Sequence, residues 1–424
     1  MSRARDLADS ADKDIVGTIT VDGLTVAGNV SADGGTIKLD GNYPVGTGNV
    51  ALGDTALDSL TSGGNNTAVG TEALTSNASG NANTAMGRAV LNSTTGSQNS
   101  GFGSLALYDN TSGQYNTAVG AEALTNNTTA SYNTAAGYQA LTSNIIGLEN
   151  SAFGFRALDV NLASYNNAFG SETLGSNTTG SANTAIGHAA LGLNTTASYN
   201  TAVGYQASYN NTTGTSNVSL GFKSLLSATT ANNSTALGES ALRANTTASD
   251  NTAVGFSALT ANTTGRINTA VGKNSMLANT TGGDNSAFGG LTLDANTTGN
   301  SNTALGYATL SANTTGNYST AVGSLALYSN TTAGGNTAVG NQAMQNTTTA
   351  GGSIAMGYTA MLNNTTGGSL TGLGYEALLA NTTGSSNTAV GRAALRSNTT
   401  ASENTAVGYQ AMYSNTTGTP NVAV

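Results

Sequence analysis

The sequence has no cysteine and no tryptophan, and only 2 of its 424 residues are proline. The absence of cysteine excludes disulfide bonds and thiolate metal sites. Charged residues make up only 8% of the chain, against about 25% in typical globular proteins. The hydrophobic content of 38% does not fit disorder, which combines low hydrophobicity with high net charge. The composition therefore predicts an ordered chain of unusual architecture.

Long apolar runs are also missing. No stretch approaches the roughly 18 residues that a membrane span requires. The first residues, MSRARDLADSADKD, lack the apolar core of a secretory signal. The net charge is −9, and residues 1–60 hold nine acidic and four basic residues. This negative balance argues against nucleic acid as a partner.

What the sequence has in abundance is a repeat. A glycine closing an N-T-A-V-G-like unit, here called the anchor glycine, recurs 22 times between Gly53 and Gly408. Nineteen of the 21 gaps are 17 residues long and two are 16. The shorter gaps fall in NSTTGSQ (92–98) and NLASYN (161–166), and a tolerated deletion marks that part of the unit as a loop. Such a period predicts a repeat architecture.

The columns of the repeat indicate its fold. The residue before the anchor glycine is apolar in all 22 units, and the one before that is Ala in 19. Four residues after the anchor glycine stands Leu in 17 units, and seven residues after it stands Asn in 18. Glycine and threonine leave no room for two helices in 17 residues. Two short extended segments, T-A-V and the x-A-L region, separated by turns, fit better.

We therefore predict an all-β fold, a β-solenoid or parallel β-roll of about 22 coils stacked at ~4.8 Å. In-register stacking explains the scarcity of charge, because a charged column would repel itself. Columns of Asn and Thr can instead hydrogen-bond to their own kind. The predicted organisation is an N-terminal lead over 1–16, an N-terminal β segment over 17–46 and a repeat shaft over 47–424.

Adjacent apolar residues predict two apolar strand faces. Ala and Val are adjacent before the anchor glycine, and Ala and Leu are adjacent after it. Neighbouring strand residues point to opposite faces. We expect the large residues to fill the coil interior and the Ala column to lie against another copy of the chain. The alternative is a monomer whose alanines face inward at tight corners.

The S/N-T-A-V-G-x-x-A-L unit resembles the head repeats of trimeric autotransporter adhesins, whose S-V-A-I-G-x-x-A units form left-handed parallel β-rolls. Those repeats are shorter, and the extra residues here fall in the N-T-T-G turn. The resemblance covers residues 47–424 and implies a homotrimeric fibre.

The N-terminal segment resembles the start of tail-fibre and related virion proteins of marine bacteriophages. The resemblance rests on the charged lead, the alternating strands around Asp22-Gly23 and the run G-T-I-K-L-D. The same pattern is typical of a β-hairpin with a D-G turn. Phage proteins assemble in the cytoplasm, whereas autotransporters are exported, so the missing secretory signal favours the phage.

The resemblance to phage proteins implies a structural fibre shaft of a virion that is assembled in the host cytoplasm. Residues 1–46 would attach it to a baseplate, tail or neck protein, and a distal tip would contact the host cell surface. No membrane insertion is expected. The alternative is the head of a bacterial surface trimeric adhesin.

No constellation of catalytic residues stands out. His188, the only histidine, occupies the variable position after its anchor glycine. Acids recur two residues after the anchor glycine at Glu72, Glu122, Glu172 and Glu376, where other units have Gln. This is typical of a solvent-facing column and not of the paired carboxylates of a glycosidase. We predict no enzyme activity, no cofactor and no metal site.

Two further expectations concern threonine and the end of the chain. Threonine arrays raise an ice-binding alternative, but such a surface needs outward T-x-T pairs along a strand, whereas here the threonines are adjacent in the turn. The chain closes with T-P-N-V-A-V at 419–424, one residue before the next expected anchor glycine. Because a solenoid needs a terminal cap, we expect these residues to be the proximal part of a longer polypeptide.

Overall fold

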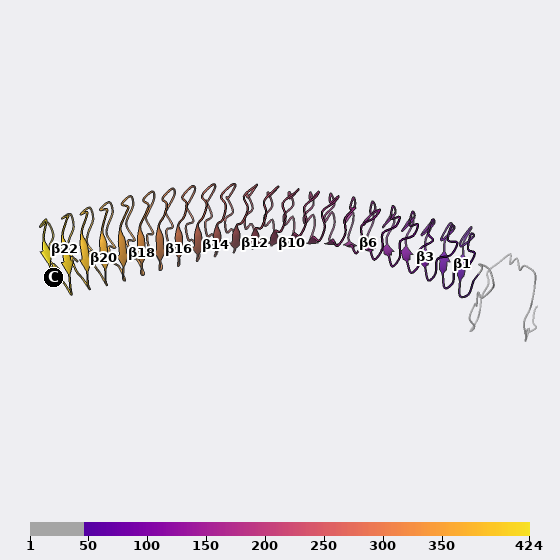
Figure 1. Cartoon of the computed structure of the whole chain (residues 1–424), viewed down its shortest axis with the longest axis horizontal. Coiled ribbons are helices and arrows are strands. Elements are labelled where there is room, and N and C mark those ends of the chain that lie inside the picture. The colour runs from indigo at the N-terminus through magenta and orange to yellow at the C-terminus, as the bar shows by residue number, and fades with distance from the viewer. Residues whose placement is uncertain (1–45) are drawn as a thin grey trace, which may run out of the picture. The chain divides into compact units, whose positions relative to one another are not determined.

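A computed structural model describes residues 46–424. The predicted lead (1–16), and the predicted N-terminal β segment (17–46) except for its last residue, lie outside the described residues. The described residues form a gently curved stack of coils, each contributing one short strand (Figure 1). The strands are β1 (Val50–Leu52), β2 (Thr67–Val69), β3 (Thr84–Met86), β4 (Ser100–Phe102), β5 (Thr117–Val119), β6 (Thr134–Ala136), β7 (Ser151–Phe153), β8 (Asn167–Phe169), β9 (Thr184–Ile186), β10 (Thr201–Val203), β11 (Val218–Leu220), β12 (Thr235–Leu237), β13 (Thr252–Val254), β14 (Thr269–Val271), β15 (Ser286–Phe288), β16 (Thr303–Leu305), β17 (Thr320–Val322), β18 (Thr337–Val339), β19 (Ile354–Met356), β20 (Thr371–Leu373), β21 (Thr388–Val390), β22 (Thr405–Val407) and β23 (Val422–Ala423).

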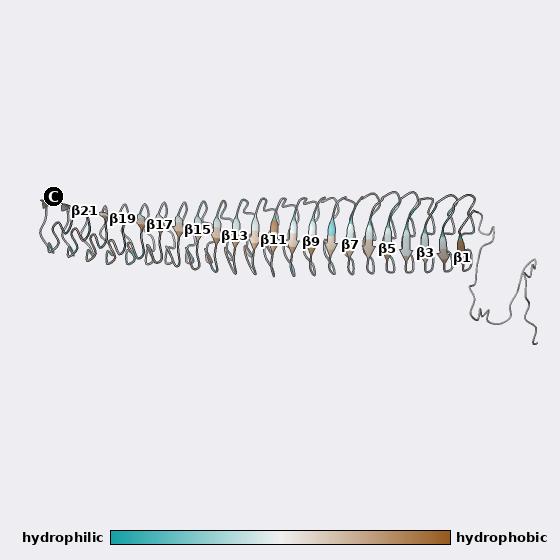
Figure 2. Cartoon of the chain, turned by 90° about the horizontal axis from the view of Figure 1, so that it is seen from below, coloured by the Kyte–Doolittle hydropathy of each residue, from teal (hydrophilic) through white to brown (hydrophobic). Residues whose placement is uncertain are grey.

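Each strand pairs in parallel with the next strand along the chain and in register with the repeat. Between β13 and β14, for example, Ala253 lies opposite Ala270 and Val254 opposite Val271. Figure 2 shows the strands side by side in one long sheet. The described residues contain no helix. The predicted all-β solenoid of about 22 coils with a 17-residue spacing is thus confirmed.

The two shorter coils are accommodated in the N-T-T-G turn. Thr95 N donates to Thr111 O (2.6 Å), and Gly96 lies against Gly113, its counterpart in the next coil. In the longer coils two residues separate the Asn and the Gly of the N-T-T-G turn. In this shorter coil a single residue, Thr95, lies between Thr94, which takes the place of the Asn, and Gly96. The missing residue is the most exposed one of the turn, which agrees with the loop predicted there.

The middle residue of each strand faces the coil interior, which corrects one prediction. Ala253 and Ala270 are fully buried, whereas the apolar residue that follows is partly exposed, as in Leu220 with 49%. The expectation that large residues of this pair fill the interior and that the Ala column meets another copy is wrong. The reason is that leucine from the x-A-L segment already occupies the interior. An ideal Cβ placed on Gly101 in a strand middle would lie 3.8 Å from Leu91 Cδ1.

The x-A-L segment is not a strand, which corrects a second prediction. The residues two and four positions after the anchor glycine have positive φ, as in Ser257 (54°) and Leu259 (51°). Ala258 and Leu259 are adjacent, yet both are buried. Alternation in the sign of φ replaces the extended backbone that would send neighbouring side chains to opposite faces. Each coil therefore has one strand and one turn-rich segment that supplies most of the core.

A column of buried asparagines, seven residues after the anchor glycine, links the coils. Asn279 Nδ2 donates to Asn262 Oδ1 (2.8 Å) and to Gly282 O (3.0 Å). Asn279 Oδ1 accepts in turn from Asn296 Nδ2 (2.7 Å). Buried amides need such partners because an unmade hydrogen bond leaves a desolvated polar group.

A second asparagine column precedes each strand. Asn302 N donates to Asn285 Oδ1 (3.0 Å), and Asn302 Nδ2 donates to Gly316 O (2.8 Å). Threonines in the turn add a third set of links, since Thr280 Oγ1 donates to Thr297 O (3.0 Å). The prediction that Asn columns hydrogen-bond to their own kind is confirmed, whereas the Thr hydroxyls bond to backbone carbonyls of the next coil.

Candidate interaction surface

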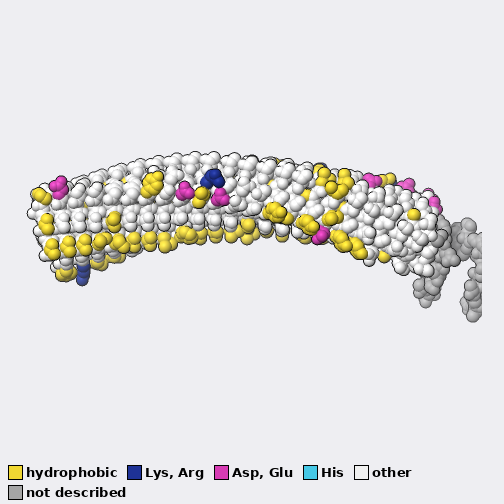
Figure 3. Space-filling model, viewed as in Figure 1, with side chains coloured by type: hydrophobic (Ala, Val, Ile, Leu, Met, Phe, Trp, Pro, Cys, Tyr) yellow, Lys and Arg dark blue, Asp and Glu magenta, His cyan; other side chains and the backbone are white. Residues whose placement is uncertain are grey.

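The residue before the anchor glycine forms a continuous row of apolar side chains on the outer face of the sheet, here called the apolar stripe. None of its side chains is buried: each is either partly exposed or exposed. Figure 3 shows exposed hydrophobic side chains in rows along the coils. Exposed apolar surface of this extent is typical of an interaction site. The stripe comprises Leu52, Val69, Met86, Phe102, Val119, Ala136, Phe153, Phe169, Ile186, Val203, Leu220, Leu237, Val254, Val271, Phe288, Leu305, Val322, Val339, Met356, Leu373, Val390 and Val407.

The alternation of the strand places this stripe. In β13 the outward residues are Thr252 and Val254, and Ala253 between them points inward. In-register pairing then lines up equal positions of successive coils, so that the rings of Phe153 and Phe169 stack with centroids 4.8 Å apart. A column of Thr or Ser flanks the apolar stripe over most of its length.

A second row, of aromatic side chains, follows the anchor glycine. Tyr205 and Phe222 stack in it with ring centroids 5.5 Å apart, as do Tyr358 and Tyr375 at 5.5 Å. His188, the histidine noted in the sequence, belongs to this row and stacks on Tyr205 at 5.4 Å. Its imidazole therefore extends an aromatic ladder.

The acidic column lies on the surface and is not drawn together. Glu122 accepts from Gln139 Nε2 (2.8 Å) in the next coil. Glu376 accepts from Arg396 Nε (2.7 Å), and this hydrogen bond raises the pKa of Arg396. Coils without an acid at this position separate the glutamates along the column. Within residues 46–424 no three His, Asp or Glu side chains are placed to hold a metal ion.

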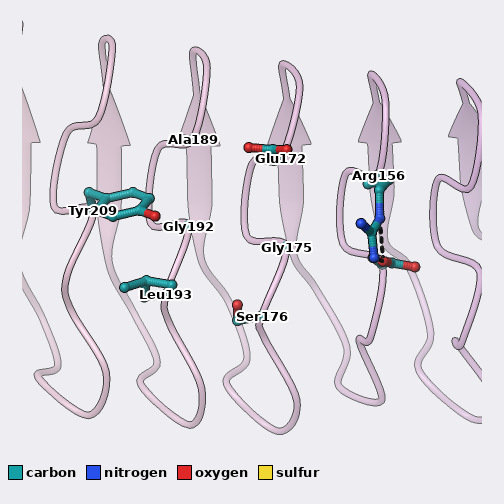
Figure 4. Close-up of a pocket in the computed structure, with 9 residues that line it drawn as sticks. Arg156, Glu172, Gly175, Ser176, Ala189, Gly192, Leu193 and Tyr209 are labelled. Carbon is teal, nitrogen blue, oxygen red and sulfur yellow. Dashed lines mark hydrogen bonds and ion pairs between the residues drawn. The ribbon is translucent and has the colours of Figure 1, made fainter.

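A shallow depression of about 200 Å³ lies on the surface of the described coils. It exists because Gly175 and Gly192 stand in successive coils at a position that carries side chains in the coils on either side, Asp159 and Tyr209. Figure 4 shows the Tyr209 ring beside Gly192 and Arg156 at the opposite end. Arg156 Nη2 lies 2.6 Å from Asp159 Oδ2, so the carboxylate is already paired.

This depression offers hydrogen-bonding groups and one aromatic ring. Its lining includes two carboxylates, Glu172 and Asp159, of which Asp159 is paired with Arg156. Sequence reasoning did not single it out, although two consecutive glycines in one column of the repeat were a readable signal. The apolar stripe was recognisable in the sequence as a column of the repeat. Its side chains were expected to point into the coil and the neighbouring alanines to point outward, whereas the structure has the reverse.

No protein-family model matches the chain, and no curated protein sequence matches it. In the part of the chain described by the structure, no helix has both the length and the apolar character to cross a membrane.

Proposed function

We propose that the chain is the shaft of a fibre on a bacteriophage particle and that it associates as a homotrimer through the apolar stripe. The proposal rests on the apolar stripe, to which each of the 22 coils contributes one apolar side chain without interruption. Another copy of the same chain has the same spacing between coils, so its apolar stripe can lie against this one along the full length of the rod. Repetition would supply length and stiffness.

The energetics favour association of this kind. The side chains of the stripe are at most 49% exposed, so burying the exposed part of one contributes up to about 1 kcal/mol, and 22 of them contribute at most on the order of 20 kcal/mol. The loss of translational and rotational freedom costs roughly 4–15 kcal/mol. The apolar stripe alone therefore offsets the cost of holding copies together.

Attachment and recognition are assigned to other parts of the fibre. Residues 1–46 would dock on a baseplate, tail or neck protein of the virion, and a distal part would contact the host cell surface. A bacterial surface adhesin with the same roll is the second candidate, because its repeats resemble those of this chain. Neither proposal involves a cofactor, a metal or an enzymatic step.

Light scattering on the purified full chain tests the association. We expect three times the chain mass of 41.7 kDa. The double variant Val254→Lys/Val271→Lys, in the apolar stripe, should lower the mass towards that of one chain. The matched control Thr264→Lys/Thr281→Lys places the same charges in the same two coils at exposed turn positions and should leave the trimer intact. A wild-type mass of one chain for folded protein would refute the trimer.

Imaging distinguishes the two candidate functions. Antibodies against the rod should label fibres on phage particles in negative stain, and a chain lacking residues 1–46 should fold but be missing from particles. Label on bacterial cell surfaces and not on particles would favour the adhesin. The ice-binding alternative loses support, because each of the strands β1–β22 has at most one outward Thr and none has a T-x-T pair.

A further inference from the structure

Four interior columns lose their usual residues at one place near the middle of the rod. Ser208 stands where the other 21 coils have Leu or Met, and Ser219 where they have Ala or Gly. Ala228 and Ser234 replace asparagines of the two buried columns. All four side chains are buried. We refer to residues 208–234 as the polar seam.

A pair of hydroxyl groups divides the core at the polar seam. Ser208 Oγ donates to Ser219 Oγ over 2.8 Å, in the space that Leu and Ala fill in other coils. The buried apolar side chains accordingly form two separate clusters. One cluster ends at Ala207, and the other begins at Leu225.

The asparagine column is interrupted at the same place. Asn211 Nδ2 donates to Asn194 Oδ1 (3.1 Å), but Asn211 Oδ1 is buried without a partner. The next coil has Ala228 at this position, and alanine has no amide to donate. The column resumes where Asn262 Nδ2 donates to Asn245 Oδ1 (3.1 Å).

Other irregular coils keep a continuous core, which shows what is particular about the polar seam. Gly372 also lacks the usual alanine methyl group, but Met361 fills the space, since an ideal Cβ on Gly372 would lie 2.7 Å from Met361 Cε. Asn330 Oδ1 is also buried without a partner, opposite Thr347. The apolar cluster nevertheless runs through both places. A lost methyl group or a lost amide link alone therefore does not divide the core.

The backbone continues across the polar seam. Strands β10 and β11 stay paired in register, and Ser208 N donates to Ser224 O (2.9 Å). In a solenoid each coil contacts its neighbours, so stability is a sum of coil terms and nearest-neighbour interface terms. A single weak interface can then separate two cooperative units.

From these observations we infer that the rod consists of two cooperative blocks, residues 46–207 and 235–424, joined by a polar seam that opens before either block unfolds. Bending and local unfolding then concentrate between residues 208 and 234. This device goes beyond the proposed shaft function and does not depend on the oligomeric state.

Hydrogen exchange followed by mass spectrometry on the full chain tests the inference peptide by peptide. Amides of residues 205–234 should exchange at least tenfold faster than those of the flanking coils, residues 171–204 and 239–272. The repaired variant Ser208→Leu/Ser219→Ala/Ala228→Asn restores the usual residue at three of the four positions and should remove this difference; Ser234 is kept, because Ser also occupies its column at 319 and 353. Thr347→Asn closes a gap in the column outside the polar seam and should leave exchange at 205–234 unchanged.

A transplanted seam provides the converse experiment. Leu310→Ser/Ala321→Ser places the hydroxyl pair at the equivalent positions of another coil and should create a second fast-exchanging region around residues 307–336. Equal protection of residues 205–234 and the flanking coils in the wild-type chain would overturn the inference. So would fast exchange at residues 205–234 that persists in the repaired variant.

Discussion

The anchor glycine is required twice over, by its backbone angles and by its neighbour. In all 22 coils its φ lies between 120° and 144°, a region that is essentially restricted to glycine. In most coils an ideal Cβ would also meet the backbone of the next anchor glycine, at 2.6 Å from Gly272 O in the case of Gly255. Glycine therefore recurs once per coil in the sequence because the backbones of successive coils come too close at this position for a side chain.

Substitution of an anchor glycine should separate these two requirements. Gly255→Ala should lower the free energy of unfolding by about 3–5 kcal/mol, through backbone strain and a collision with the next coil. Gly408→Ala is the matched control, because an added Cβ at Gly408, whose φ is 126°, meets nothing within 4 Å. It should cost only about 1–3 kcal/mol of strain. Equal losses in denaturant titrations of the two variants would contradict the role of the contact.

The buried asparagines should behave as links between coils. Asn279→Ala removes one hydrogen bond to each neighbouring coil and leaves the amide groups of Asn262 and Asn296 with one partner fewer. We expect a loss of about 2–4 kcal/mol in unfolding free energy. Asn415→Ala changes the same column at its part-exposed last member and should cost under about 1 kcal/mol. If Asn279→Ala lowered the free energy of unfolding by as little as Asn415→Ala, water would have to replace the missing amide.

At the scale of the coil, periodicity predicted the fold but not the direction of its side chains. The 17-residue spacing and the turn chemistry were sufficient to predict one parallel coil per unit. The orientation of Ala253 and Val254 was not predictable from alternation alone, because either face of a strand can be the inner one. It depends on Leu259, which enters the interior from a segment whose positive φ angles are rare for leucine. Propensity rules assign such a segment to an extended strand.

A coil should tolerate a shorter turn but not a shifted strand. Deletion of Thr264, at the exposed turn position that the two 16-residue coils lack, should change the free energy of unfolding by less than about 1 kcal/mol. Deletion of Ala270 in the middle of β14 should be far more harmful, because a one-residue slip moves the buried side chain to the outer face. Thermal unfolding followed by circular dichroism measures both. Similar melting temperatures for the two deletions would argue against the assigned register.

At the scale of the whole molecule, uniform coils make length a direct function of sequence. With 22 anchor glycines and ~4.8 Å per coil, the rod should be roughly 100 Å long. Deletion of residues 256–289 removes two complete coils and joins the chain in register, so class averages in electron microscopy should show a rod about 10 Å shorter. The cooperative unfolding should otherwise be preserved. An unchanged length, or loss of the folded state, would show that the coils are not interchangeable.

The sequence carried less information about what the rod surface does. His188 and the glutamate column were identified as surface features, and the structure places them there, in an aromatic ladder and in scattered pairs with Gln139 or Arg396. The polar seam was present in the sequence as the exceptional Ser208, but its meaning depends on Ser219 lying beside it. That proximity follows only once the stacking of coils is known.

In-register pairing also sets how the chain can fold during synthesis. Each strand pairs with a counterpart one repeat away, and 17 residues are only about 0.04 of the 424-residue chain, below the relative contact order of about 0.07–0.12 in fast-folding helical bundles. The last completed coil presents unpaired N–H and C=O groups on which the next can form. At a translation rate of about 5–20 residues per second, a ribosome delivers roughly one coil every 1–3 s. A longer rod of this kind therefore needs more time to be made, but no additional time to find its fold.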